Sequence, residues 1–277
     1  MDVETNGPEQ TNSTHLTNSK VTSPLANLPL ERATTSRHSQ EPSHTQEALT
    51  SPVPSVTMPF DSVYSYLQSQ ILPVSEPITP AQQSKFINYL DEELLKIQRK
   101  FIKDQADTIE TYSLSQLQKE LLVLIKLIWV SITKRNKLFG QADYLIKILG
   151  DLEDYLFHYK TIFVLQNQVP VISGTERSKL IQFFEFFQDI DSKLSLLMDG
   201  YEVGNTTEKL SSTQVVRLIP LASRLRIQIV SSLDTNRLAL QRNFQASNAI
   251  EESRNLLDIL DVEIGRLFEG VLERSEL

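Results

Sequence analysis

Residues 124–145 read LIKLIWVSITKRNKLFGQADYL, and this stretch decides the fold class. It starts almost unbrokenly apolar, contains the chain's only tryptophan, Trp129, and turns basic before Gly140. Three structures fit such a pattern: a membrane anchor, a nucleic-acid-binding segment, or two packed helices that meet at a turn. The apolar run, residues 121–132, is shorter than the roughly 20 residues that span a bilayer, and Lys126 interrupts it. A membrane anchor is therefore excluded.

Helical periodicity around this stretch favours two packed helices. Ser113 and Gln116 have the spacing of a capping box, and apolar residues then cover much of the helix circumference as far as Ile132. Such a helix is expected at the centre of a bundle. Three basic residues are expected in its last turn, where cations stabilise the negative end of the helix dipole: Lys134, Arg135 and Lys137. Gly140 is the predicted stop, and a second helical pattern follows it.

The first 80 residues differ in composition from the rest of the chain. They hold 10 of the 12 prolines and 23 Ser or Thr residues, and no aromatic residue precedes Phe60. Such a segment cannot bury enough apolar surface to offset its conformational entropy, so residues 1–78 are predicted to be a disordered tail. Residues 61–72 are expected to form a short amphipathic helix, capped by Asp61, that either folds back on the domain or docks on a partner.

Two Ser-Pro dipeptides lie within this tail, and a Thr-Pro dipeptide directly follows it. They are candidate sites for proline-directed kinases, with phosphorylation at Ser23, Ser51 and Thr79. Three such dipeptides in a stretch of this composition are close to chance, so plain disorder is the alternative interpretation.

Residues 79–277 are predicted to be an all-helical interaction domain. They are dense in Leu, Ile, Phe, Lys, Glu and Gln, which are mostly good helix formers. The fold class is therefore all-α: an antiparallel bundle of five to six long helices. Thr79 and Pro80 begin a helix of about 28 residues with one apolar stripe. A capping box at Ser173 begins another, which Gly200 ends.

Three features of the second half carry further expectations. Four phenylalanines between residues 183 and 187 exceed one apolar stripe, so this helix is buried on two sides or meets a partner there. Residues 201–213 are expected to be a polar loop. Pro220 is expected to kink or break the helix that follows.

Charge is distributed unevenly along the C-terminal third. Residues 213–245 contain five arginines and one acid, whereas residues 251–277 contain eight acids and three arginines. The arginines could pair with the acidic terminal helix, with an acidic protein partner, or with nucleic acid, and the candidates are Arg217, Arg224 and Arg226. The terminal segment has apolar residues at heptad spacing, which suits one bundle helix or one partner-binding helix: Ile250, Leu257, Leu260, Ile264, Leu267 and Val271.

The sequence carries no recognisable catalytic or metal-binding set. There is no cysteine, which excludes disulfides and thiolate chemistry, and only His158 lies within the domain, where a packed helix position is expected. No HExxH, GxSxG or Walker-type motif is present. We therefore predict a protein that is not an enzyme and that uses no cofactor, metal or small-molecule substrate. Of the formal net charge of −8, residues 1–80 contribute 3 − 8 = −5 and the domain 24 − 27 = −3, and a domain so close to neutral argues against broad binding to DNA or anionic lipid.

The order of motifs resembles a known family. After the Ser/Pro-rich leader come RKFIKDQ (99–105), LLVLIKLIWVSI (121–132) and LFGQADYLIKILGDLEDYL (138–156), followed by FFEFFQDIDSKLSLLMDG (183–200) and TQVVRLIPLASRLRIQIV (213–230). This pattern resembles the fungal accessory (eleventh) subunit of general transcription factor TFIIH over about residues 80–275.

The resemblance implies a non-enzymatic nuclear protein of transcription and DNA repair. It would bind the XPB-type helicase subunit of TFIIH and promote its dissociation from the complex. Two other functions remain open from the residues alone: a helical tether or adaptor at a kinetochore or in vesicle trafficking, and a nucleic-acid-binding helical module.

Overall fold

The computed structural model describes residues 57–71, 76–106, 112–159, 174–246 and 251–275, all within one compact unit, residues 51–277. The described residues form six long helices: α2 (Pro80–Ala106), α3 (Leu114–Val130), α4 (Gln141–His158), α5 (Gly174–Asp199), α6 (Ser212–Ala246) and α7 (Glu251–Arg266). Two short helices, α1 (Phe60–Gln70) and α8 (Glu269–Glu273), and a hairpin of β1 (Tyr201–Val203) and β2 (Thr206–Glu208) complete them. The predicted all-α bundle is confirmed. The predictions for residues 1–56, Ser173 and Ile250 lie outside the described residues.

Capping boxes start three of the long helices. The Thr79 amide donates to Gln82 Oε1 at 2.8 Å, and the Gln82 amide donates to Thr79 Oγ1 at 3.3 Å. Ser113 and Gln116 make the same reciprocal pair at the start of α3. Each box satisfies amide groups that the first helical turn leaves unpaired. The predicted starts at Thr79 and Ser113 are confirmed, the box predicted at Ser173 lies outside the described residues, and an additional box, Ser211 with Gln214, begins α6.

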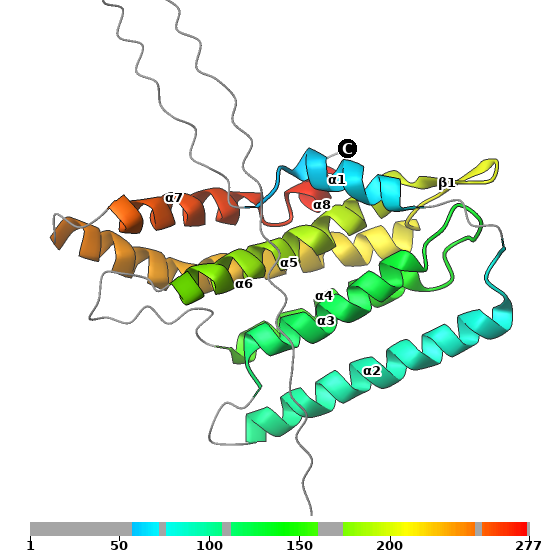
Figure 1. The fold of residues 1–277 in the computed structure, drawn as a ribbon, viewed down its shortest axis with the longest axis horizontal. Helices are drawn as coiled ribbons and strands as arrows, with labels where there is room; N and C mark the ends of the chain where they lie inside the picture. The colour runs from blue at the N-terminus through cyan, green and yellow to red at the C-terminus, as the bar shows by residue number, and fades with distance from the viewer. Residues whose placement is uncertain (1–56, 72–75, 107–111, 160–173, 247–250, 276–277) are drawn as a thin grey trace, which may run out of the picture. The chain divides into compact units, whose positions relative to one another are not determined.

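The core forms where the apolar stripes meet. In α3 the side chains of Leu117, Leu121, Ile125 and Ile128 are fully buried, as expected of a central helix. This helix packs against α2, α4 and α5, and α2 lies beside it in Figure 1. The outer helices cover the other side, where α6 packs against α4 and α7 runs along α6.

The end of α3 differs from the prediction. The helix ends at Val130, so Lys134, Arg135 and Lys137 lie in the connection to α4 and not in a last helical turn. The Ser131 hydroxyl donates to the Ile128 carbonyl at 2.7 Å, and the Asn136 amide group donates to Thr133 Oγ1 at 3.0 Å. Short polar side chains of this kind bind nearby backbone and compete with the helix.

The segment after α5 also differs, because it forms a hairpin and not a loop. Gly200 ends α5 as predicted and has φ +93°, a conformation that residues with a Cβ rarely adopt. A Cβ there would lie 2.8 Å from Thr207 Cγ2, so only glycine lets the two strands close. All four predicted phenylalanines of α5 are buried, and the helix is packed on more than one side, between α1, α3, α4 and α8.

The terminal helix is interrupted. The heptad pattern predicted one helix through Val271, but α7 ends at Arg266 and Phe268 adopts a left-handed conformation with φ 55°. The side chain of Phe268 is 1% exposed and stacks edge-on against Phe187 of α5. Burial of this ring accompanies the break in the helix. By contrast, α6 continues as one helix through Pro220, where a kink or a break was expected.

Helix α1 folds back on the bundle. The helix is confirmed, but it begins at Phe60 with Pro59 at the cap position, so Asp61 is not its cap. Leu67 and Ile71 are each 3% exposed, and the Tyr64 hydroxyl donates to Asp199 Oδ2 at 2.7 Å. The guanidinium of Arg274 lies over the rings of Phe60 and Tyr64, which adds cation–π attraction.

Asp191 holds α8 in place beside α1. Its carboxylate, almost fully buried, accepts hydrogen bonds from the amides of Gly270 and Val271 at 2.9 and 2.8 Å. Burial raises the pKa of Asp191 to about 6, even though the two amides and Arg274 act in the opposite direction.

Substituting Gly270 tests the contact between α1 and α8. A Cβ at this position would lie 2.4 Å from the Phe60 ring and from Ser195 Oγ. We expect Gly270→Ala to lower the free energy of unfolding by about 1–3 kcal/mol in urea denaturation and to increase hydrogen exchange in α1. Gly265→Ala, on the same chain segment and with no atom within 4 Å of its Cβ, is the control. Equal stability of the two variants would contradict the packing described.

The raised pKa of Asp191 also predicts that the free energy of unfolding depends on pH. Because its pKa is raised to about 6 in the folded chain, from roughly 3.9 when unfolded, its ionisation opposes folding. The free energy of unfolding of the wild type should fall, relative to Asp191→Asn, as pH rises from about 4 to about 6. Urea denaturation across that range measures the difference. The exposed Asp61→Asn provides a matched control, and a difference that is flat or rises with pH would refute the assignment.

Candidate partner-binding site

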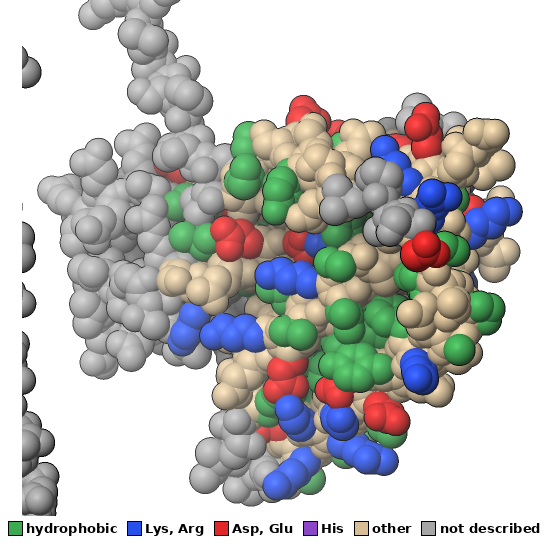
Figure 2. All heavy atoms as spheres, turned by 45° about the vertical axis from the view of Figure 1, so that its right-hand side comes forward, with side chains coloured by type: hydrophobic (Ala, Val, Ile, Leu, Met, Phe, Trp, Pro, Cys, Tyr) green, Lys and Arg blue, Asp and Glu red, His purple; other side chains and the backbone are tan. Residues whose placement is uncertain are grey.

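An apolar groove of about 900 Å³ lies between α1, α3 and α5. Met58 and Tyr66 line it from the α1 segment and Val130 from α3, and these side chains are 61%, 62% and 76% exposed. Figure 2 shows one face of the molecule on which hydrophobic side chains gather, with charged side chains around them. Contiguous exposed apolar surface of this kind marks interaction sites in soluble proteins.

A buried ammonium group lies in the wall of the groove. Lys193 of α5 is 2% exposed, pairs with Asp189 one turn earlier, and lies 5.7 Å from the ring centre of Trp129. Burial lowers the pKa of Lys193, and the positive charge of Lys126 acts in the same direction, against the effect of Asp189. An ion pair in such a place is costly unless further contacts stabilise it.

Several polar atoms of the lining residues have no hydrogen-bond partner among the described residues. They are Gln118 Nε2, Trp129 Nε1 and Asp189 Oδ2. A buried polar group left unpaired costs about 1–3 kcal/mol, so native proteins keep few of them. All three atoms are shielded from solvent, so they belong to the wall of the groove and not to its open surface.

The rim of the groove carries charges that no described ion pair uses. Lys119 and Lys126 of α3 lie two helical turns apart, line the groove and are exposed. Glu185 faces the same groove from α5. These residues are solvated in the free chain and are available to a charged partner.

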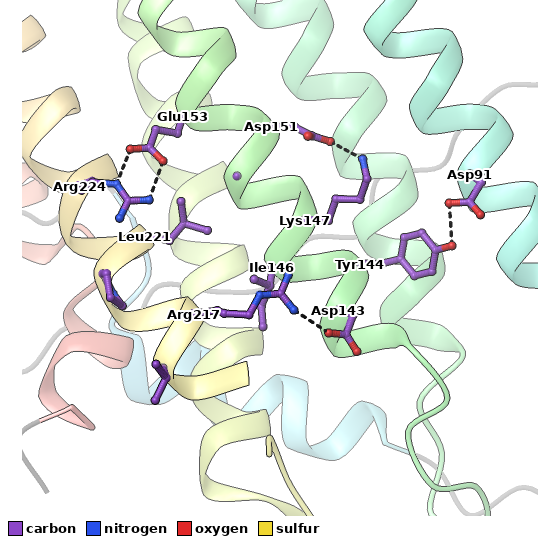
Figure 3. A pocket seen from close by; sticks show the side chains of 13 residues that line it. Asp91, Asp143, Tyr144, Ile146, Lys147, Asp151, Glu153, Arg217, Leu221 and Arg224 are labelled. Atoms are coloured by element: carbon purple, nitrogen blue, oxygen red, sulfur yellow. Dashed lines mark hydrogen bonds and ion pairs between the residues drawn. The ribbon is translucent and has the colours of Figure 1, made fainter. Parts of the chain in front are cut away.

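Two of the predicted arginines, Arg217 and Arg224, lie elsewhere, around a polar hollow between α2, α4 and α6. Arg217 pairs with Asp143 at 3.3 Å, and Arg224 pairs with both carboxylate oxygens of Glu153 at 2.6 and 3.0 Å; the side chains of both pairs are drawn in Figure 3. The hydrogen bond from Arg224 lowers the pKa of Glu153. The pairing of these two arginines with the terminal helix was therefore wrong, because their acids belong to α4.

The terminal helix does receive other arginines. Arg226 donates to the Gly265 carbonyl at 3.0 Å, and Arg237 pairs with Asp261 at 2.7 Å. The arginine-rich segment of α6 thus faces α4 with some residues and α7 with others. The sequence could not distinguish the two, since both neighbours carry acids.

Most predicted contact residues of the terminal segment pack inside the bundle. Leu260, Leu267 and Val271 are at most 4% exposed, and Leu257 and Ile264 are partly buried against the same core. Of these, only the partly buried residues could touch a partner without opening the bundle. Their role in partner binding remains a prediction.

No catalytic arrangement emerges among the described residues. They contain no cluster of His, Asp and Glu that could hold a metal ion, and His158 packs edge-on against Phe101 with ring centres 5.2 Å apart. The described helices include none long and apolar enough to cross a membrane.

Sequence reasoning missed the groove, although signals for it were present. The short helix at 61–72, the lysine that interrupts the apolar run, and the excess phenylalanines each contribute a lining residue: Tyr66, Lys126 and Phe186. These residues come from three distant segments, and no local pattern joins them.

Comparison with known proteins gives the family. The model of subunit 11 of the general transcription factor TFIIH (TFB6) matches residues 112–258, from just before the start of α3 into α7. The chain is 30% identical over 226 residues to the general transcription and DNA repair factor IIH subunit TFB6 of Saccharomyces cerevisiae. That match covers 65% of this chain and 63% of the relative, less than two thirds of its length. No solved structure matches the chain. Because the family model covers more than half of the sequence, the chain belongs to the family of subunit 11 of TFIIH.

Proposed function

We propose that this chain is a non-enzymatic accessory subunit of TFIIH in the nucleus, which binds the XPB-type helicase subunit and promotes its dissociation from the complex. The observation that carries the proposal is the family match over residues 112–258. The relative's name connects that protein with transcription and DNA repair. Binding to the helicase and its release are the finer steps, and they require direct tests.

A protein without catalytic groups can act on such a complex only through binding energy. To release a subunit, it must bind the released form more tightly than the form held in the complex. A difference of about 1.4 kcal/mol changes the ratio of released to bound subunit tenfold. A helical surface with an apolar groove and unpaired rim charges can supply a difference of that size, because one partner helix buries several apolar side chains.

The paired charges around α4 and α6 favour a protein partner over nucleic acid. Arg217 and Arg224 are held by Asp143 and Glu153, so a phosphate would have to displace a carboxylate from each of them. Binding to nucleic acid through this region would therefore be weak.

A DNA-binding assay tests this expectation. We expect no binding of a 30-base-pair duplex at micromolar chain and physiological salt, and at low salt only weak binding that Arg217→Ala with Arg224→Ala does not change. Fluorescence anisotropy at two salt concentrations gives the measurement. Tight binding that these substitutions abolish would make the nucleic-acid module the better function.

The main proposal is tested by reconstitution. Tagged chain should recover TFIIH subunits from nuclear extract, and added pure chain should lower the amount of helicase subunit retained by immobilised TFIIH in a concentration-dependent manner. An unrelated acidic helical protein at equal concentration is the control, since mass action or charge alone would affect both. Recovery of kinetochore or vesicle proteins in place of TFIIH would favour the tether or adaptor.

The terminal-segment residues and the arginines remain candidate contacts with that partner. Deleting the segment would remove Leu260, Leu267 and Val271 from the core, so loss of binding after deletion would not place the contact. Point substitution at the partly buried Leu257 and Ile264 is the informative variant.

A further inference from the structure

We infer that the groove between α1, α3 and α5 binds an amphipathic helix of a partner protein, whose apolar face enters the groove and whose acidic flank faces Lys119 and Lys126. The inference concerns the surface and the chemistry of its occupant. It does not require that the partner be a helicase, and its test contains no TFIIH component.

The dimensions of the groove suit a helix. Its lining residues on α3 extend from Ser115 to Val130, which corresponds to about 22 Å at 1.5 Å per residue. A partner helix of about four turns has that length. The walls are themselves helices, so their side-chain ridges can interlock with those of another helix.

The surface chemistry requires an apolar face on the occupant. Met58, Tyr66 and Val130 expose most of their side chains into water, and Leu122 and Phe186 continue the apolar lining. Helix-in-groove recognition uses anchors spaced three to four residues apart, as an amphipathic helix presents them.

The charges select an acidic flank. Lys119 and Lys126 lie seven residues apart on the α3 rim, exposed and without an ion pair among the described residues. The acids of the lining, Glu185 and Asp189, belong to α5, and Asp189 already pairs with Lys193. Carboxylates seven residues apart on a partner helix would lie opposite the two free lysines.

The chain's own terminal helix does not suit this role. Its acidic residues match the lysines, but its apolar face is used inside the bundle, where Leu260 and Val271 are buried. A partner from another protein is therefore the occupant that the observations favour.

The test uses Trp129, the only tryptophan of the chain, as a reporter inside the groove. The probes are two 18-residue helical peptides without tryptophan that share a leucine stripe. One carries glutamates seven residues apart on one flank, and the other carries lysines there. Titrated into the full chain, the glutamate peptide should change the Trp129 emission and bind roughly tenfold more tightly than the lysine peptide. The reason is that the two rim lysines attract the glutamates of the first peptide and repel the lysines of the second.

Charge reversal provides the decisive variant. Lys119→Glu with Lys126→Glu should reverse the preference, so that the lysine peptide now binds more tightly. Lys134→Glu with Lys137→Glu makes the same change in net charge outside the groove and should keep the wild-type preference. A gain of binding cannot come from unfolding, and the helical circular dichroism of each variant is the check on folding.

A second pair of variants tests the apolar contact. Val130→Asp in the groove should weaken binding of the glutamate peptide at least tenfold, whereas Ile227→Asp should not. Ile227 is 66% exposed on α6 and does not line the groove.

Four results would overturn the inference. They are no binding of either peptide, equal binding of both, a preference that survives charge reversal, and sedimentation showing a dimer of this chain that Val130→Asp disrupts. The last result would assign the groove to a second copy. None of these outcomes affects recovery of TFIIH subunits by tagged chain, so failure here and failure of the proposed function are distinguishable.

Discussion

Burial of α3 is the constraint on which the rest of the structure depends. Its apolar residues cover so much of the circumference that no single neighbour can shield them, and α2, α4 and α5 each pack against a different side. Even so, one sector stays uncovered, where Val123 and Val130 expose most of their side chains. The groove follows from this incomplete coverage, since α1 shields only part of the surface between α3 and α5.

Helix α1 forms one wall of the groove and is attached to the bundle by polar contacts. Two carboxylates anchor it: the buried Glu263 accepts hydrogen bonds from the amide and hydroxyl of Thr57, and the exposed Asp199 accepts them from Tyr64 and Arg274. Gly270 lets the Phe60 ring approach α8 closely. These contacts hold α1 in place as one wall of the groove.

Much of the fold could be predicted because its determinants are local. The boxes at Thr79 and Ser113 begin helices wherever they are placed, since both partners lie within one turn. The apolar stripes of α2, α3 and α5 likewise follow from a 3.6-residue period. Less could be predicted of the candidate site, because Trp129, Lys193 and Tyr66 meet only after three separate helices have packed.

The sequence by itself determined the helices, most of their first residues and the absence of familiar catalytic motifs. Tertiary structure alone decided that Arg217 and Arg224 pair with α4, and that Phe268 interrupts the last helix. The physical reason is the range of the forces involved. A cap or a stripe depends on neighbours three or four residues away, whereas the bond between Thr57 and Glu263 joins residues 206 positions apart, for which no local pattern exists.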